Sequence, residues 1–79
     1  MKFEWTESAY TMVKTWDLHL CSKDGVGRRR MGSLYRIEDG RYVVVERNYA
    51  SDPIVLDADL SLEDAQRAAK LLICTGGAA

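Results

Sequence analysis

Alternation between apolar and polar positions predicts that most of the first sixty residues form β-strands. Between Tyr10 and Cys21 the even positions are mainly apolar and the odd positions mainly polar. A period of two with β-branched and aromatic residues is typical of a half-buried strand. One helix face is the alternative, because it would hold Ala9, Met12, Val13 and Trp16. The strand propensity of Thr, Val, Trp and Tyr favours the strand.

Two turn sequences divide the next residues into strands. Asp24-Gly25 and Asp39-Gly40 both supply residues that tolerate a positive φ, as tight hairpins require, and Asp39-Gly40 predicts a two-residue hairpin turn. A strand is expected from about Met31 to Glu38, and another from Arg41 to Arg47. The second is apolar on both faces, which is typical of a central strand covered on both sides. The odd positions are expected to form the apolar face of the first: Met31, Ser33, Tyr35 and Ile37.

Apolar residues at both ends of the region predicted to form strands indicate further β-structure. Asn48 to Pro53 is expected to be a loop, and the alternation from Ile54 to Leu60 predicts a half-buried strand. Near the N-terminus, Phe3 and Trp5 are expected either to form a short extra strand or to lie over the core.

A C-terminal amphipathic helix is predicted from Leu62 to Cys74. Ser61 is a strong N-cap residue, and Asp64 three positions later completes a capping box. Acids in the first turn suit the helix dipole, and Gly76-Gly77 is expected to end the helix. The face expected against the sheet is apolar: Leu62, Ala65, Ala69, Leu72 and Ile73.

These elements predict one α+β domain over residues 1–79. It is an antiparallel β-meander of about four strands, packed by one C-terminal amphipathic helix. A single helix covers only one face of a sheet, so the other face needs polar residues or a partner. The apolar run 42–45 and Val55 indicate that this second face is not fully polar. Unless the N-terminal aromatic residues cover it, we expect it to be an interface with a partner or a second copy.

Composition excludes several classes of protein. The chain is 47% hydrophobic and 29% charged, which argues against a disordered protein. No apolar run approaches the roughly 18 residues of a membrane span, and the first residues lack the apolar stretch of a signal peptide. We therefore expect a cytoplasmic protein with no membrane partner. Cys21 and Cys74 are expected to be reduced thiols, with a bridge between them as the alternative.

No set of residues predicts catalysis, a cofactor or a metal. Asp17, His19 and Cys21 share one strand face, but no spacing typical of a zinc site accompanies them. Asp57 and Asp59 also share a face, as the solvated side of an amphipathic strand commonly does. We expect a non-enzymatic binding protein, because the paired acid, base and nucleophile of an active site are lacking.

Charge is unevenly distributed along the chain, although its net value is −1. Residues 14–47 carry eight Lys/Arg and five Asp/Glu (8 − 5 = +3), and residues 48–79 carry two Lys/Arg and five Asp/Glu (2 − 5 = −3). The run Arg28-Arg29-Arg30 lies where a hairpin tip is expected, near Tyr35 and Tyr42. Arg36, Arg41 and Arg47 add to this basic region. Such a tip could contact phosphates, or it could be a solvated loop.

A resemblance to known proteins rests on two segments. Gly32-Ser33-Leu34-Tyr35-Arg36 with Asp39-Gly40 and Tyr42, followed by Leu60 to Ala65, is similar to small proteins of bacteriophages and mobile elements. The same segments resemble the arm-type DNA-binding domains of tyrosine integrases, in which three strands precede a helix. Small phage proteins of this kind are often inhibitors of host factors, including anti-CRISPR proteins. The resemblance implies an inhibitor that occludes the surface of a host protein or a protein–nucleic-acid complex.

Two hypotheses for the partner follow. In the first, the arginine run contacts an acidic or phosphate-rich protein surface, or the acids contact a basic one. In the second, the arginine tip and the strand aromatic residues bind nucleic acid directly. A homodimer through the uncovered sheet face is compatible with both. The candidate partner-binding residues are Arg28, Arg29, Arg30, Arg36, Tyr35, Tyr42, Asp57, Asp59, Glu63 and Asp64.

Overall fold

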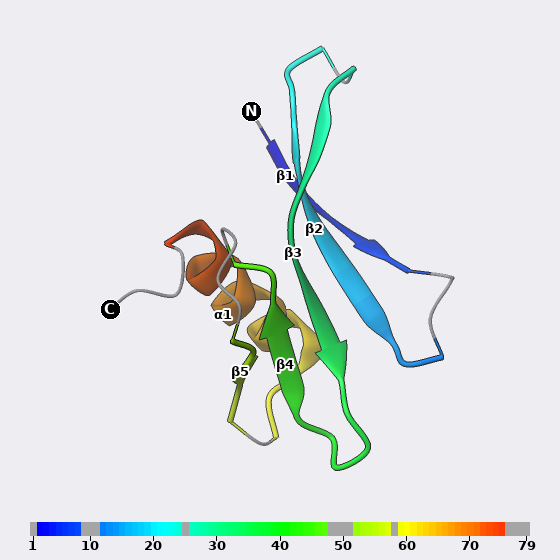
Figure 1. The fold of residues 1–79 in the computed structure, drawn as a ribbon, viewed down its shortest axis with the longest axis vertical. Helices are drawn as coiled ribbons and strands as arrows, with labels where there is room; N and C mark the ends of the chain where they lie inside the picture. Colours follow the sequence, from blue (N-terminus) through cyan, green and yellow to red (C-terminus); the bar gives the residue numbers. More distant parts are fainter. Residues whose placement is uncertain (1, 9–11, 25, 48–51, 58, 76–79) are drawn as a thin grey trace.

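The fold is an antiparallel sheet of five strands followed by one helix, so the predicted meander and C-terminal helix are confirmed (Figure 1). This computed structural model describes residues 2–8, 12–24, 26–47, 52–57 and 59–75. Predictions for Tyr10, the loop 48–51 and Gly76-Gly77 lie outside these residues. The elements are β1 Lys2–Glu7, β2 Thr15–Cys21, β3 Arg28–Arg36, β4 Tyr42–Val45, β5 Ile54–Val55 and α1 Leu62–Cys74.

The strands lie in the sheet in chain order, β1-β2-β3-β4-β5, and each pairs antiparallel with the next. The number of strands is five rather than about four, because the N-terminal segment is a strand. Phe3 and Trp5 belong to β1, where they lie opposite Leu20 and Leu18 of β2. They therefore extend the core on the side of the helix and do not cover the other face of the sheet.

Three predicted strand boundaries were wrong by three residues or more. β2 begins at Thr15, and the residues just before it are exposed, with Met12 fully accessible. The chain reverses there, and a hydrogen bond from the Ser8 amide to the Thr15 carbonyl closes the β1–β2 pairing. β3 begins at Arg28 rather than Met31, and β5 ends at Val55 rather than Leu60.

The apolar face predicted for the third strand was also wrong. Leu34 is fully buried and lies between Trp16 of β2 and Val44 of β4, so the even positions face the core here. Leu18 pairs with Gly32 but His19 pairs with Arg30, which leaves Met31 as an extra residue in a β-bulge. A bulge reverses the alternation of faces along the strand, so Arg28 and Arg30 before it lie on the same face as Ser33 and Tyr35 after it.

The β3–β4 hairpin confirms the predicted position of its turn. The Ile37 amide donates to the Arg41 carbonyl, and Gly40 has a φ of +87°. The loop is three residues long rather than two, with glycine in the left-handed position that such loops require. The Asp39 carboxylate also accepts a hydrogen bond from the Arg41 amide at 2.9 Å.

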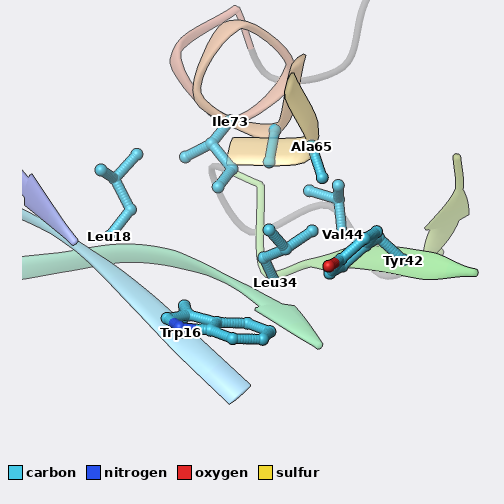
Figure 2. Close-up of a cluster of buried hydrophobic side chains, with 8 residues drawn as sticks. Trp16, Leu18, Leu34, Tyr42, Val44, Ala65 and Ile73 are labelled. Carbon is cyan, nitrogen blue, oxygen red and sulfur yellow. The ribbon is translucent and has the colours of Figure 1, made fainter. Parts of the chain in front are cut away.

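Helix α1 has the predicted bounds, and it lies mainly against β3 and β4 (Figure 1). The hydroxyl of its N-cap, Ser61, accepts a hydrogen bond from the Asp64 amide at 3.2 Å. Small side chains let the helix approach the sheet closely, and its buried residues are Ala65, Ala69 and Ile73. Figure 2 shows Ile73 and Ala65 pointing from the helix toward the sheet residues Leu34 and Val44.

Candidate functional site

The face of the sheet opposite α1 is the candidate partner-binding surface, and we call it the open face. No described helix or strand packs on it. Alternation along each strand and the pairing register determine which side chains lie on this face. Its strand residues are Lys2, Glu4, Thr6, Thr15, Asp17, His19, Cys21, Arg28, Arg30, Ser33, Tyr35, Val43, Val45 and Val55.

Arg28 lies within a polar network on the open face. Its Nη2 is 3.6 Å from the Glu4 Oε1, and it donates to the Thr6 hydroxyl at 3.1 Å. The same nitrogen is 3.4 Å from the His19 Nδ1. The Cys21 thiol lies 3.9 Å from the second oxygen of Glu4. The residues opposite Arg28 in β1 and β2 therefore already hold its guanidinium.

Arg30 is held in the same way by two acids, one on β2 and one directly after β4. Its Nε lies 3.3 Å from the Asp17 carboxylate, and its Nη1 lies 2.9 Å from the Glu46 carboxylate. Ser33, which is only 1% exposed, accepts hydrogen bonds from Arg30 and donates to Asp17 at 2.6 Å. Glu46 directly follows β4 and has a φ of +61°, a conformation that non-glycine residues seldom adopt.

The arginine run thus has a different setting from the one predicted. All three arginines belong to β3 and not to a hairpin tip, and they alternate between faces. Arg28 and Arg30 lie on the open face beside acids, whereas Arg29 pairs with Leu20 on the helix side. The open face consequently carries matched charges, and its arginines form no uncompensated basic patch.

The other half of the open face is apolar. Tyr35, Val43 and Val55 are consecutive cross-strand partners on β3, β4 and β5. Val43 is only 3% exposed, whereas Val55 is 52% exposed. Val45 continues this apolar surface along β4. The open face therefore combines an apolar half with a half of paired charges.

Other residues of the predicted basic and aromatic region are not on this face. Tyr42 is 4% exposed and contacts Trp16, with ring centroids 6.1 Å apart, so its ring belongs to the core (Figure 2). The Arg36 guanidinium lies 5.6 Å from the centre of the Tyr42 ring. Arg47 is 5% exposed and donates to the Val44 carbonyl at 3.2 Å. Of the predicted aromatic and basic residues, Tyr35, Arg28 and Arg30 are strand residues of the open face.

The predicted acids form a separate region. Asp57 and Asp59 are exposed, but they follow β5 rather than sharing one face of it, and Asp59 has a φ of +68°. Glu63 and Asp64 lie in the first turn of α1, where Arg67 is 3.5 Å and 3.4 Å from their carboxylates. The structure therefore divides the predicted site residues among the open face, the core and the helix start.

The described residues also form two surface depressions. One, of about 300 Å³, lies at the β2–β3 hairpin and is lined by Leu20, Ser22, Gly27, Arg28 and Arg29. The other, of about 290 Å³, lies on the outer side of α1 and is lined by Arg67, Lys70, Leu71 and Cys74. Cys21 and Cys74 are both free thiols. Within the described part of the chain, no three His, Cys, Asp or Glu side chains are grouped to hold a metal.

The hairpin beside the first depression is stabilised by local hydrogen bonds. Ser22 donates to the Asp24 carboxylate, which also accepts from the Val26 amide at 3.1 Å. These hydrogen bonds lower the pKa of the Asp24 carboxyl below its ordinary value of 3.8, and the bond from Ser22 makes the largest contribution. The Ser22 hydroxyl also accepts from the Gly27 amide at 2.9 Å, so it connects the two sides of the turn.

Sequence reasoning missed most of the open-face network. It grouped Asp17, His19 and Cys21 correctly, because they share a strand, but it did not bring Glu4 or Glu46 to the arginines. Cross-strand neighbours depend on register, which the sequence pattern does not specify here. The alternation of charged and aromatic residues in Lys2–Glu7 was the available signal.

The fold and the open face define this chain as a small α+β domain with a five-stranded antiparallel sheet covered by a helix on one side. Comparison of the chain with protein-family models, curated proteins and solved structures gave no match. No helix among the described residues is both long and apolar enough to cross a membrane.

Proposed function

We propose that this chain is a non-enzymatic protein-binding domain and that it contacts its partner through the open face. The observation that supports this proposal is the pairing of an apolar half, centred on Tyr35, Val45 and Val55, with a half of matched charges. Protein interfaces commonly combine an apolar centre containing aromatic residues with a polar rim. The expected partner surface is therefore a protein surface with an apolar centre and mixed charges.

The charge pairing favours a protein over nucleic acid as the partner. A nucleic-acid interface gains most of its affinity from cations that are available to phosphates. Arg28 and Arg30 already contact Glu4, Asp17 and Glu46, so phosphate binding would have to break these ion pairs. A partner protein can bind beside the ion pairs without breaking them.

The inhibitor hypothesis is a narrower form of this proposal. A chain of 79 residues that binds through one sheet face can act by covering the functional surface of a larger protein. The resemblance to small phage proteins, anti-CRISPR inhibitors among them, supports a host protein as the one that is covered.

The test is affinity capture from a lysate of the native host cell, with matched substitutions of exposed apolar residues. Val55→Glu places a charge in the apolar half of the open face, where the side chain is 52% exposed. Leu71→Glu makes the same chemical change on the outer side of α1, where the side chain is 66% exposed. We expect a captured protein to be lost with Val55→Glu and retained with Leu71→Glu. Loss of the captured protein with Leu71→Glu and its retention with Val55→Glu would instead place the contact on α1.

Nucleic-acid binding remains the second candidate, because Arg28 and Arg29 line the depression at the β2–β3 hairpin. Its test is fluorescence anisotropy with labelled duplex DNA, single-stranded DNA and RNA at low and moderate salt. Direct binding predicts an affinity that falls steeply with salt and is lost with Arg28→Glu/Arg29→Glu/Arg30→Glu. No binding at low salt would remove nucleic acid as a direct ligand.

A further inference from the structure

Strand β1 forms one edge of the sheet, and no described residue pairs with its outer side. The Ser8 amide donates to the Thr15 carbonyl, so the even-numbered residues of this segment bond toward β2. Backbone groups alternate in direction along an antiparallel strand. The N–H and C=O groups of Phe3, Trp5 and Glu7 consequently point outward, where another strand can pair with them.

The side chains next to this edge are suited to a partner strand. Phe3 and Trp5 lie on the helix side of the sheet and are only partly buried, so part of each aromatic surface is accessible. Lys70 of α1 places its ammonium 4.9 Å from the centre of the Phe3 ring. An apolar edge with a cation above it favours a strand that brings an acid to the position opposite Phe3.

We propose that β1 pairs with β1 of a second copy, antiparallel, with Trp5 opposite Trp5 on the two-fold axis. In this register Phe3 of each copy lies opposite Glu7 of the other, and Glu4 lies opposite Thr6. Every outward-pointing residue of β1 then exchanges backbone hydrogen bonds with an outward-pointing residue of the second copy. The sheet becomes continuous across the two molecules.

Charge complementarity favours this register over the one that places Phe3 opposite Trp5. Glu7 opposite Phe3 comes close to Lys70 of the other copy, because that ammonium lies over the Phe3 ring. The register that places Phe3 opposite Trp5 instead sets Glu4 against Glu4, and like charges directly opposite destabilise a sheet. A slip by one residue would place side chains on the wrong face, so it is excluded.

Edge strands commonly carry charges that prevent such association. Lys2, Glu4 and Glu7 are charges of this kind, but in the proposed register none of them faces a like charge. The two-fold axis is perpendicular to the sheet, so both open faces point to the same side of the dimer. A partner with two equivalent sites would then contact both copies at once.

The experiment is sedimentation equilibrium of the full chain from micromolar to millimolar concentration. We expect a reversible dimer whose dissociation constant rises ~10-fold or more with Glu7→Lys or Lys70→Glu, because each places like charges together. The double variant Glu7→Lys/Lys70→Glu reverses the pair and is expected to restore dimerisation. Glu38→Lys, an exposed charge reversal in the β3–β4 turn, is the matched control and is expected to leave the dissociation constant unchanged.

A second variant tests the backbone pairing itself. Glu7→Pro removes an outward-pointing N–H that makes no bond to β2, and proline is tolerated at the free side of an edge strand. We expect this variant to keep the circular dichroism spectrum of the monomer and to lose the dimer. A strict monomer at millimolar concentration, or a dimer that Glu7→Lys and Glu7→Pro leave unchanged, would overturn the proposal.

Discussion

At the scale of single residues, Gly32 determines how closely α1 approaches the sheet. A Cβ at this position would lie 2.8 Å from the Ile73 Cδ1 and 2.9 Å from the Val45 carbonyl oxygen. We expect Gly32→Ala to lower the free energy of unfolding by about 1–3 kcal/mol, because the helix must shift away from β3. Urea denaturation measures this change. Gly27→Ala is the control, since its Cβ would be 3.3 Å from the Ser22 hydroxyl oxygen and should cost much less.

Glu46 is a second residue with an unusual local constraint. Its φ of +61° is costly for any residue with a Cβ, and its carboxylate reaches Arg30 at 2.9 Å. Glu46→Ala and Glu46→Gly both remove the ion pair with Arg30, but only glycine relieves the backbone strain of the positive φ. We expect the glycine variant to be more stable than the alanine variant by about 1 kcal/mol in thermal unfolding. Position 38 is the control, because the φ of Glu38 is not positive. There the Glu38→Ala variant should be more stable than the Glu38→Gly variant.

At the scale of elements, the start of α1 depends on one side chain. The Ser61 hydroxyl accepts the hydrogen bond from the Asp64 amide, which would otherwise lack a partner in the helix. We expect Ser61→Ala to reduce the free energy of unfolding by ~1 kcal/mol. Ser61→Asp supplies another capping oxygen and should retain most of the stability. Equal losses in the two variants in chemical denaturation would contradict a capping role.

Elements differed in how well the sequence predicted them. The bounds of α1 were predicted correctly, because the capping residue Ser61 and the amphipathic period are both local signals. The strand from Tyr10 was predicted too long, since Met12 fits the alternation although it lies before β2 and is fully exposed. Alternation alone does not show where an antiparallel chain must reverse.

At the scale of the whole molecule, one small core carries the stability. Leu34 is fully buried between the sheet and α1 (Figure 2), and a domain of this size has few such residues. We expect Leu34→Ala to cost about 2–5 kcal/mol in urea unfolding, a large share of the stability of a small domain. Leu71→Ala, at an exposed position of α1, should cost much less. Similar losses in the two variants would contradict the core that the structure shows.

The distribution of charge in the folded molecule differs from the distribution along the sequence. The sequence suggested a basic segment and an acidic segment, yet Arg28 and Arg30 contact Glu4, Asp17 and Glu46. Pairing across strands brings together charges that are distant in the chain. Arg28 and Arg30 are therefore paired locally on the open face, whereas the net charges of residues 14–47 and 48–79 stay as the sequence sets them.

The sequence alone determined the class of fold, the helix and the position of the β3–β4 turn, because these depend on neighbours within a few residues. It also indicated that one face of the sheet would be uncovered, since a single helix cannot cover both. Only the tertiary structure decided which residues occupy that face. The bulge at Met31 reverses the alternation of β3, and the register brings β1 beside the arginine-bearing hairpin. Register depends on packing between segments that are distant in the sequence, and local sequence patterns do not determine that packing.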